Sequence, residues 1–124
     1  MNERVHERQI EMWIYEYMVT LHLFKAIEWD RKHAASMKLS RIWEAFFEQL
    51  ARSVEKRHVD VKRKLRRSGC RIVLEEVTEK RDVHMMYVYK GYEYHSTIMP
   101  AVLKGKCEEK LGEMLLNDWE IMEI

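Results

Sequence analysis

The chain has 124 residues, of which 47% are apolar and 35% are charged, and its formal net charge is +1. An apolar share of this size supports a hydrophobic core, so the composition excludes a generally disordered chain. The small net charge excludes a protein that binds polyanions by its total charge alone. The length predicts a single domain over residues 1–124.

The first residues do not resemble a secretory signal, because residues 1–12 are rich in charge and lack a long apolar run. The longest apolar run, residues 17–24, is far shorter than a membrane-crossing helix. Cys70 and Cys107 are distant in sequence and show no metal-binding spacing. We therefore expect a cytoplasmic protein with reduced thiols, no membrane segment and no cofactor.

Residues 1–68 contain neither glycine nor proline, the two residues that most often interrupt helices. One helix of that length would be unusual in a small domain, so we predict a helical hairpin over residues 4–68. The weakest helical stretch is residues 32–40, where Ser36 or Ser40 could cap the second helix.

The first predicted helix, residues 4–33, has apolar residues on more than one face. One row contains Ile10, Ile14, Tyr17, Leu21 and Phe24, and a second contains Met12, Tyr15, Val19, Leu23 and Ala26. Such a helix needs more than one neighbour to bury it, either within the chain or in a partner subunit. The second row predicts a homodimer interface, or an interface with another protein, around Met12, Tyr15, Val19 and Trp29.

The second predicted helix, residues 39–68, has a single apolar stripe, which indicates one buried face. The stripe contains Leu39, Ile42, Trp43, Phe46, Leu50, Val54, Val61 and Leu65. His58 occupies the step between Val54 and Val61. Gly69 is well placed to end this helix after its basic last turns.

Beyond Gly69 the pattern is typical of strands over residues 70–77, 83–89 and 92–99, with a turn at 79–82. Pro100 can begin a final helix that ends near Leu116, because proline is tolerated in a first helical turn. The inward face of this helix contains Leu103, Cys107, Leu111 and Met114. The predicted fold is therefore α+β: an N-terminal long helical hairpin, a three-stranded antiparallel sheet and a C-terminal helix over residues 100–116.

Four tyrosines follow one another across the predicted turn at Lys90-Gly91, namely Tyr87, Tyr89, Tyr92 and Tyr94. A two-residue turn pairs Tyr89 with Tyr92 and Tyr87 with Tyr94, so all four share one face of the sheet. That face either packs beneath helices or stacks on nucleic-acid bases.

Charge is distributed unevenly along the chain. Residues 51–71 contain nine basic and two acidic residues, a net charge of +7, whereas residues 107–124 have a net charge of −5. The candidate phosphate contacts are Lys62, Arg63, Lys64, Arg66, Arg67 and Arg71. The alternative is that the basic segment complements the acidic tail, within the chain or across a dimer.

The sequence contains no recognisable catalytic motif, and its four glycines are isolated, so no phosphate-binding loop is expected. Glu55/His58 and Asp30/His33 have the spacing of carboxylate-bridged metal sites in helical bundles, but nothing forces further carboxylates inward. We therefore predict no catalytic and no metal-binding residues. A metal-dependent bundle enzyme is the least favoured hypothesis.

Two hypotheses remain for function. The first is a small cytoplasmic, non-catalytic interaction or regulatory protein that self-associates. The alternative is a nucleic-acid-binding protein that uses the basic segment and the tyrosine-bearing β-hairpin.

Overall fold

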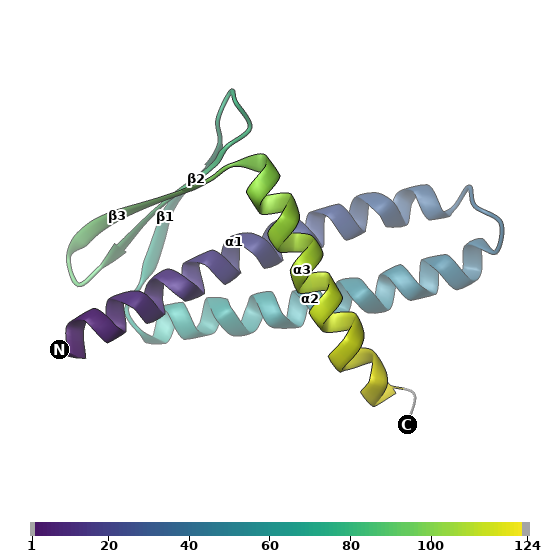
Figure 1. Ribbon diagram of the computed structural model, residues 1–124, viewed down its shortest axis with the longest axis horizontal. Coiled ribbons are helices and arrows are strands. Elements are labelled where there is room, and N and C mark those ends of the chain that lie inside the picture. Colours follow the sequence, from purple (N-terminus) through teal and green to yellow (C-terminus); the bar gives the residue numbers. More distant parts are fainter. Residues whose placement is uncertain (1, 123–124) are drawn as a thin grey trace.

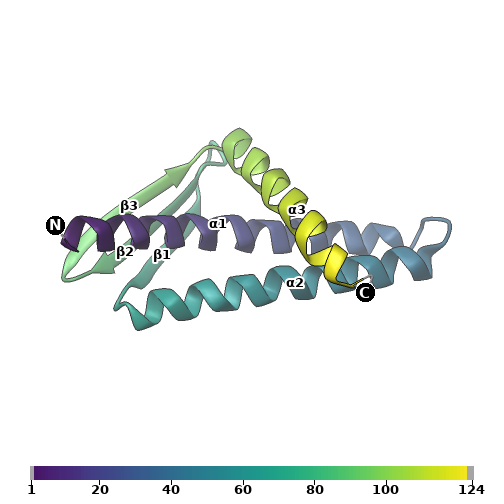
Figure 2. The same ribbon diagram turned by 60° about the horizontal axis from the view of Figure 1, so that its bottom comes forward.

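The computed structural model describes the backbone of residues 2–122 and the side chains of residues 6–116. The predicted α+β fold is confirmed (Figure 1). The elements in chain order are α1 (Asn2–Ala34), α2 (Ser40–Arg67), β1 (Arg71–Val77), β2 (Val83–Tyr89), β3 (Tyr92–Ile98) and α3 (Pro100–Met122). Helices α1 and α2 form the hairpin, the sheet lies beside the N-terminal half of α1, and α3 crosses both helices (Figure 1 and Figure 2).

The turn between α1 and α2 differs from its prediction, because no serine caps α2. The residue before α2 is Leu39, which adopts a left-handed conformation with φ 62° and makes no side-chain capping bond. The hydroxyl of Ser36 instead donates to the carbonyl of His33 over 2.9 Å. Ser36 therefore satisfies the C-terminal end of α1 and is not available to the amides of α2.

The end of α2 agrees with its prediction and fixes the start of the sheet. The amide of Cys70 donates to the carbonyl of Leu65 over 2.9 Å, and the amide of Gly69 donates to that of Arg66 over 3.1 Å. Gly69 has φ +80°, so this is a Schellman motif with glycine in the left-handed position. Cys70 and Leu65 are both buried in the same cluster, which supplies the hydrophobic contact typical of the motif.

The predicted register of the β2–β3 hairpin is confirmed. Tyr87 pairs with Tyr94 and Tyr89 pairs with Tyr92, and the rings of Tyr87 and Tyr94 stack with centroids 5.3 Å apart. Lys90 and Gly91 both have positive φ, 52° and 81°, as a two-residue type I′ turn requires. β1 pairs with the other side of β2, so the strand order is β1-β2-β3.

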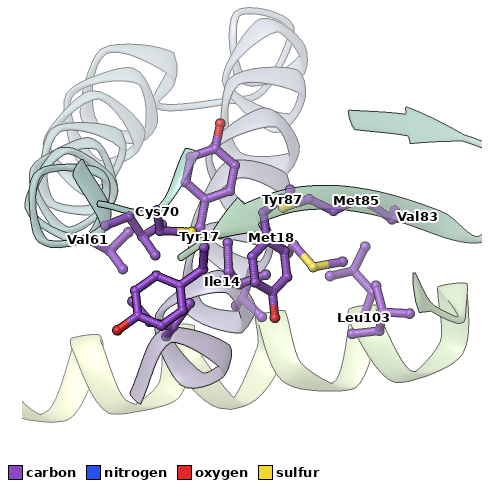
Figure 3. Close-up of a cluster of buried hydrophobic side chains, with 14 residues drawn as sticks. Ile14, Tyr17, Met18, Val61, Cys70, Val83, Met85, Tyr87 and Leu103 are labelled. Atoms are coloured by element: carbon purple, nitrogen blue, oxygen red, sulfur yellow. The ribbon is translucent and has the colours of Figure 1, made fainter. Parts of the chain in front are cut away.

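Helix α1 is buried by three neighbours, all supplied by the chain itself. Ile14 and Met18 belong to a cluster that includes Met85 and Tyr87 of β2, Val61 of α2 and Leu103 of α3 (Figure 3). Farther along α1, a second cluster joins Leu23 and Ile27 to α2 and α3. Each cluster takes residues from both apolar rows of α1, so the N-terminal half of the helix packs in one cluster and its C-terminal half in the other.

Helix α3 holds the hairpin and the sheet together. Its predicted inward residues Leu103, Cys107, Leu111 and Met114 all pack against the two clusters. The helix runs to Met122 and not to Leu116, because residues 117–122 contain neither glycine nor proline to end it. None of the described helices is long and apolar enough to cross a membrane.

Two glycine substitutions are expected to change stability in opposite directions. Replacing Gly91 with Ala should lower the free energy of unfolding by about 1 kcal/mol, because alanine is strained at φ +81°. Replacing Gly105 with Ala should raise it by about 0.5–1 kcal/mol, because the position is helical and an added Cβ meets no atom within 4 Å. Urea denaturation measures both effects, and equal shifts for the two variants would contradict the turn geometry.

Candidate basic cleft and interaction surfaces

The tyrosine face packs against α1, so the predicted stacking surface is largely closed. Tyr87 and Tyr89 are buried in the cluster that contains Ile10 and Ile14. Tyr94 is half-buried, and Tyr92 alone of the four is exposed. Tyr87 and Tyr89 were therefore wrong as open stacking residues, because the sheet uses this face to cover α1.

The predicted interface on α1 is divided by α3. Met12 and Trp29 are exposed, Tyr15 is half-buried, and Val19 is buried. The thiol of Cys107 in α3 lies 3.7 Å from the backbone carbonyl of Val19. Val19 was therefore wrong as a surface contact. Beside it, Met12 and Tyr15 line a cavity of about 510 Å³ between α1 and α3.

An exposed apolar surface lies instead at the turn of the hairpin. We call it the distal patch, and it comprises Met37, Leu39, Ile42 and Trp43. The ring of Trp43 contacts the rings of Phe46 and Phe47, with centroids 6.0 and 6.4 Å away, so the patch continues into the core. The sequence assigned Leu39, Ile42 and Trp43 to the buried stripe. They are exposed because the contacts of α3 with α2 lie farther along the helix, at Leu50, Ala51 and Val54.

A second feature is a concave surface at the opposite end of the hairpin. We call it the basic cleft: a cavity of about 610 Å³ where α1, the end of α2 and the start of β1 meet. Lys62 and Arg66 project from consecutive turns of α2, and Arg71 is the first residue of β1. Leu65, Cys70 and Ile72 supply apolar wall, and Tyr17 and Glu75 complete the polar lining.

The six predicted phosphate contacts thus form two sets. Lys62, Arg66 and Arg71 line the basic cleft, whereas Arg63, Lys64 and Arg67 are exposed on α2 outside it. Arg63 lies 3.9 Å from Asp60, a solvent-exposed pair that contributes little stability. The acidic residues beyond Leu116 lie outside the described side chains, so pairing of the basic segment with the acidic tail stays a prediction.

A polar cluster beside the cleft links α1, α2 and β1. The hydroxyl of Tyr17 donates to Oε1 of Glu75 over 2.5 Å. Thr20 lies 2.9 Å from Nδ1 of His58, and its hydroxyl donates to the carbonyl of Glu16 over 2.8 Å. The ring of His58 also packs on that of Tyr17, with centroids 4.6 Å apart. The sequence spacing placed His58 on the apolar stripe of α2. Only the folded structure shows that its ring contacts Thr20 and Tyr17 of α1.

Burial determines the protonation states in this cluster. It lowers the pKa of His58, with a further contribution from the positive charge of Lys62. It raises the pKa of Tyr17 well above its ordinary value, and the hydrogen bond and negative charge of Glu75 act in the same direction. Both side chains are therefore neutral near pH 7, so the cluster offers hydrogen bonds and no additional charge.

Another polar group lies on the sheet face that points away from α1. Nε2 of His84 lies 3.2 Å from Nδ1 of His95, whose Nε2 lies 3.0 Å from Glu93. The hydroxyl oxygen of Thr97 extends this row of hydrogen-bonding groups and lies 2.9 Å from Nδ1 of His84. Over the described side chains, no group of three or more His, Cys, Asp and Glu residues is arranged to hold a metal ion.

The free energy of unfolding is expected to decrease as the pH is lowered, because of His58. Its pKa in the folded state is below the ordinary 6.5, so the unfolded chain binds more protons as the pH drops below 6.5. The stabilising contribution is fully present above pH 6.5 and is lost as the pH falls toward the folded-state pKa. Urea denaturation between pH 7.5 and 5 should show a shallower loss for His58→Asn than for the unmodified chain. His33→Asn, at an exposed histidine, is the control, and an unchanged pH dependence in His58→Asn would contradict this assignment.

Comparison with known proteins identifies the family of this chain. No curated protein and no solved structure matches the sequence significantly. One family model, described as YhjD protein, matches residues 5–118 and therefore covers the hairpin, the sheet and most of α3. The chain belongs to the YhjD family.

Proposed function

We propose that this protein is a small, non-catalytic interaction protein that self-associates through the distal patch. The observation that carries the proposal is the exposure of three large apolar side chains at the start of α2, one on the residue before the helix and two on its first turn. Leu39 is 70% exposed, Ile42 is 64% exposed and Trp43 is 39% exposed. Contiguous apolar surface of this kind is typical of protein interfaces, since its burial is favourable by about 25 cal/mol per Å².

The surroundings of the patch favour a second copy of the same chain as its occupant. Residues of both charge signs line a neighbouring hollow at the same end of the hairpin, including Arg31, Arg41, Glu44 and Glu48. In a twofold dimer each surface meets itself, so a mixed-charge border can pair opposite charges across the symmetry axis. A border of one sign would repel its own copy.

We also propose a cytoplasmic location. Cys70 and Cys107 are both free thiols, and neither is paired with the other. Burial raises the pKa of Cys70 to about 11, so this thiol stays protonated and is slow to oxidise. Free, unreactive thiols are typical of proteins in reducing compartments.

Replacing Ile42 with Glu is expected to dissociate the oligomer. A charge in the middle of the distal patch must lose water when two copies associate, which opposes the interface. Analytical ultracentrifugation over a hundredfold range of concentration should give a mass approaching two chains for the unmodified protein and one chain for the variant. Val59→Glu is the matched control, because Val59 is an exposed apolar residue of α2 outside the patch. A single-chain mass for the unmodified protein at every concentration would refute the proposal.

Nucleic-acid binding is the second candidate, and the basic end of α2 favours it. Lys62, Lys64, Arg66 and Arg67 are exposed on its last turns, and Arg71 follows at the start of β1. Concentrated, accessible cations are the electrostatic requirement for binding a phosphate backbone. Stacking would depend on Tyr92 and the edge of Tyr94, since the other two tyrosines are buried.

A triple substitution tests this candidate. The outer variant, Arg63→Ala/Lys64→Ala/Arg67→Ala, should weaken binding to labelled DNA or RNA. On duplex DNA it should also reduce the slope of log affinity against log salt by about 3, because three phosphate contacts are lost. Fluorescence anisotropy at several salt concentrations measures both. The control is Lys25→Ala/Lys32→Ala/Lys38→Ala, which removes the same charge from exposed positions elsewhere. Equal weakening by the two variants would exclude the basic end of α2 as the specific site.

A further inference from the structure

We propose that the basic cleft is a binding site for a small phosphomonoester with a compact apolar group. The cleft lies where the end of α2, the start of β1 and the middle of α1 meet, at the opposite end of the hairpin from the distal patch. The proposal therefore does not depend on self-association. It also differs from nucleic-acid binding, because it assigns the ligand to a cavity and not to the outer surface of α2.

The charge of the cleft selects a dianion. Three cationic side chains line it, Lys62, Arg66 and Arg71, against the single carboxylate of Glu75, which leaves a net charge of +2. In the part of the chain whose side chains are described, no acidic group lies within ion-pair distance of these cations. The carboxylate of Glu75 is already engaged by the hydroxyl of Tyr17. A phosphomonoester carries a charge of about −1.5 to −2 at pH 7 and so matches this excess.

The guanidinium groups add a geometric reason to favour phosphate. Arg66 and Arg71 come from different elements, so a tetrahedral group between them can accept hydrogen bonds from two directions. Arginine presents its donors as a planar fork that binds phosphate oxygens in pairs. Lys62, one turn before Arg66, supplies a third donor on the same side of α2.

The rest of the cleft suits an apolar group attached to the phosphate. Leu65 and Cys70 are buried and Ile72 is half-buried, and together they form an apolar wall beside the cations. The volume of about 610 Å³ lies within the range of small-molecule sites, about 300–1,000 Å³. An inorganic ion would leave this wall without a contact, whereas a single ring would cover it.

The backbone around the cleft is also preorganised. The Schellman motif fixes the path from Leu65 to Cys70, and the bond between Tyr17 and Glu75 fixes β1 against α1. Ordering these groups before binding reduces the entropic cost of holding a ligand. The thiol of Cys70 stays protonated because burial raises its pKa to about 11, so the site binds its ligand without attacking it.

The test uses phenyl phosphate and benzoate, which share a ring but differ in charge. Backbone amide shifts in a heteronuclear NMR titration would locate each probe, and calorimetry would give its affinity. Phenyl phosphate should saturate with shifts centred on residues 62–72 and bind about tenfold more tightly than benzoate, since a second negative charge contacts the cations. The cleft variant Lys62→Ala/Arg66→Ala/Arg71→Ala should lose at least about tenfold in affinity.

The outer variant is the matched control, because it removes the same charge from the same end of α2. It should bind phenyl phosphate within about twofold of the unmodified chain, since its three cations lie outside the cavity. Thermal denaturation establishes that both variants fold. Equal affinity for benzoate would overturn the assignment to phosphate. Three results would overturn the site itself. They are an equal loss of affinity for phenyl phosphate in the two variants, amide shifts spread along the whole of α2, and no saturation at millimolar phenyl phosphate.

Discussion

Helix α1 has more apolar surface than any one neighbour can bury, and the rest of the structure is arranged around it. One face of α1 contacts the sheet, another contacts α2 and a third contacts α3. Ile14 and Met18, on its N-terminal half, are almost completely buried. The chain satisfies this requirement by placing three later parts of the fold around α1, so the contacts that bury α1 join residues distant in sequence.

This constraint explains why Tyr87 and Tyr89 do not form an open binding surface. A three-stranded sheet needs an apolar or aromatic face against a helix to be stable. Tyr87 and Tyr89 provide that face, while Tyr92 follows the Lys90-Gly91 turn and is exposed. Tyrosine suits the position because its ring packs against the helix while its hydroxyl reaches a polar partner, as Tyr94 does with Glu7 at 3.3 Å.

Burying α1 also leaves two separate candidate surfaces, one at each end of the hairpin. At the turn of the hairpin, the first turns of α2 lie beyond the contacts of α3, so their apolar residues face solvent. At the other end, the basic turns of α2 meet β1 and enclose a cavity with Tyr17 and Glu75 of the neighbouring elements. The proposed self-association surface and the proposed anion site lie at opposite ends of the hairpin, so they do not compete for space.

The sequence by itself determined the elements and the register of the hairpin. The absence of glycine and proline before Gly69 predicted two long helices, and the spacing of the tyrosines around Lys90-Gly91 predicted the pairs that the sheet contains. These are local properties, because helical periodicity, turn chemistry and alternation depend on residues near one another in the chain. The concentration of positive charge in residues 51–71 was also evident from the sequence alone.

Only the tertiary structure decided which of those residues are accessible and which lie together. Val19 and Trp43 occupy similar apolar patterns, yet α3 covers the first and leaves the second exposed. Lys62 and Arg63 are adjacent in sequence, yet only Lys62 lines the cleft. Glu75 meets Tyr17 across 58 positions of the chain. Periodicity identifies an apolar or charged face of a helix, but the path of a distant element across that face determines whether it becomes core, cavity or surface.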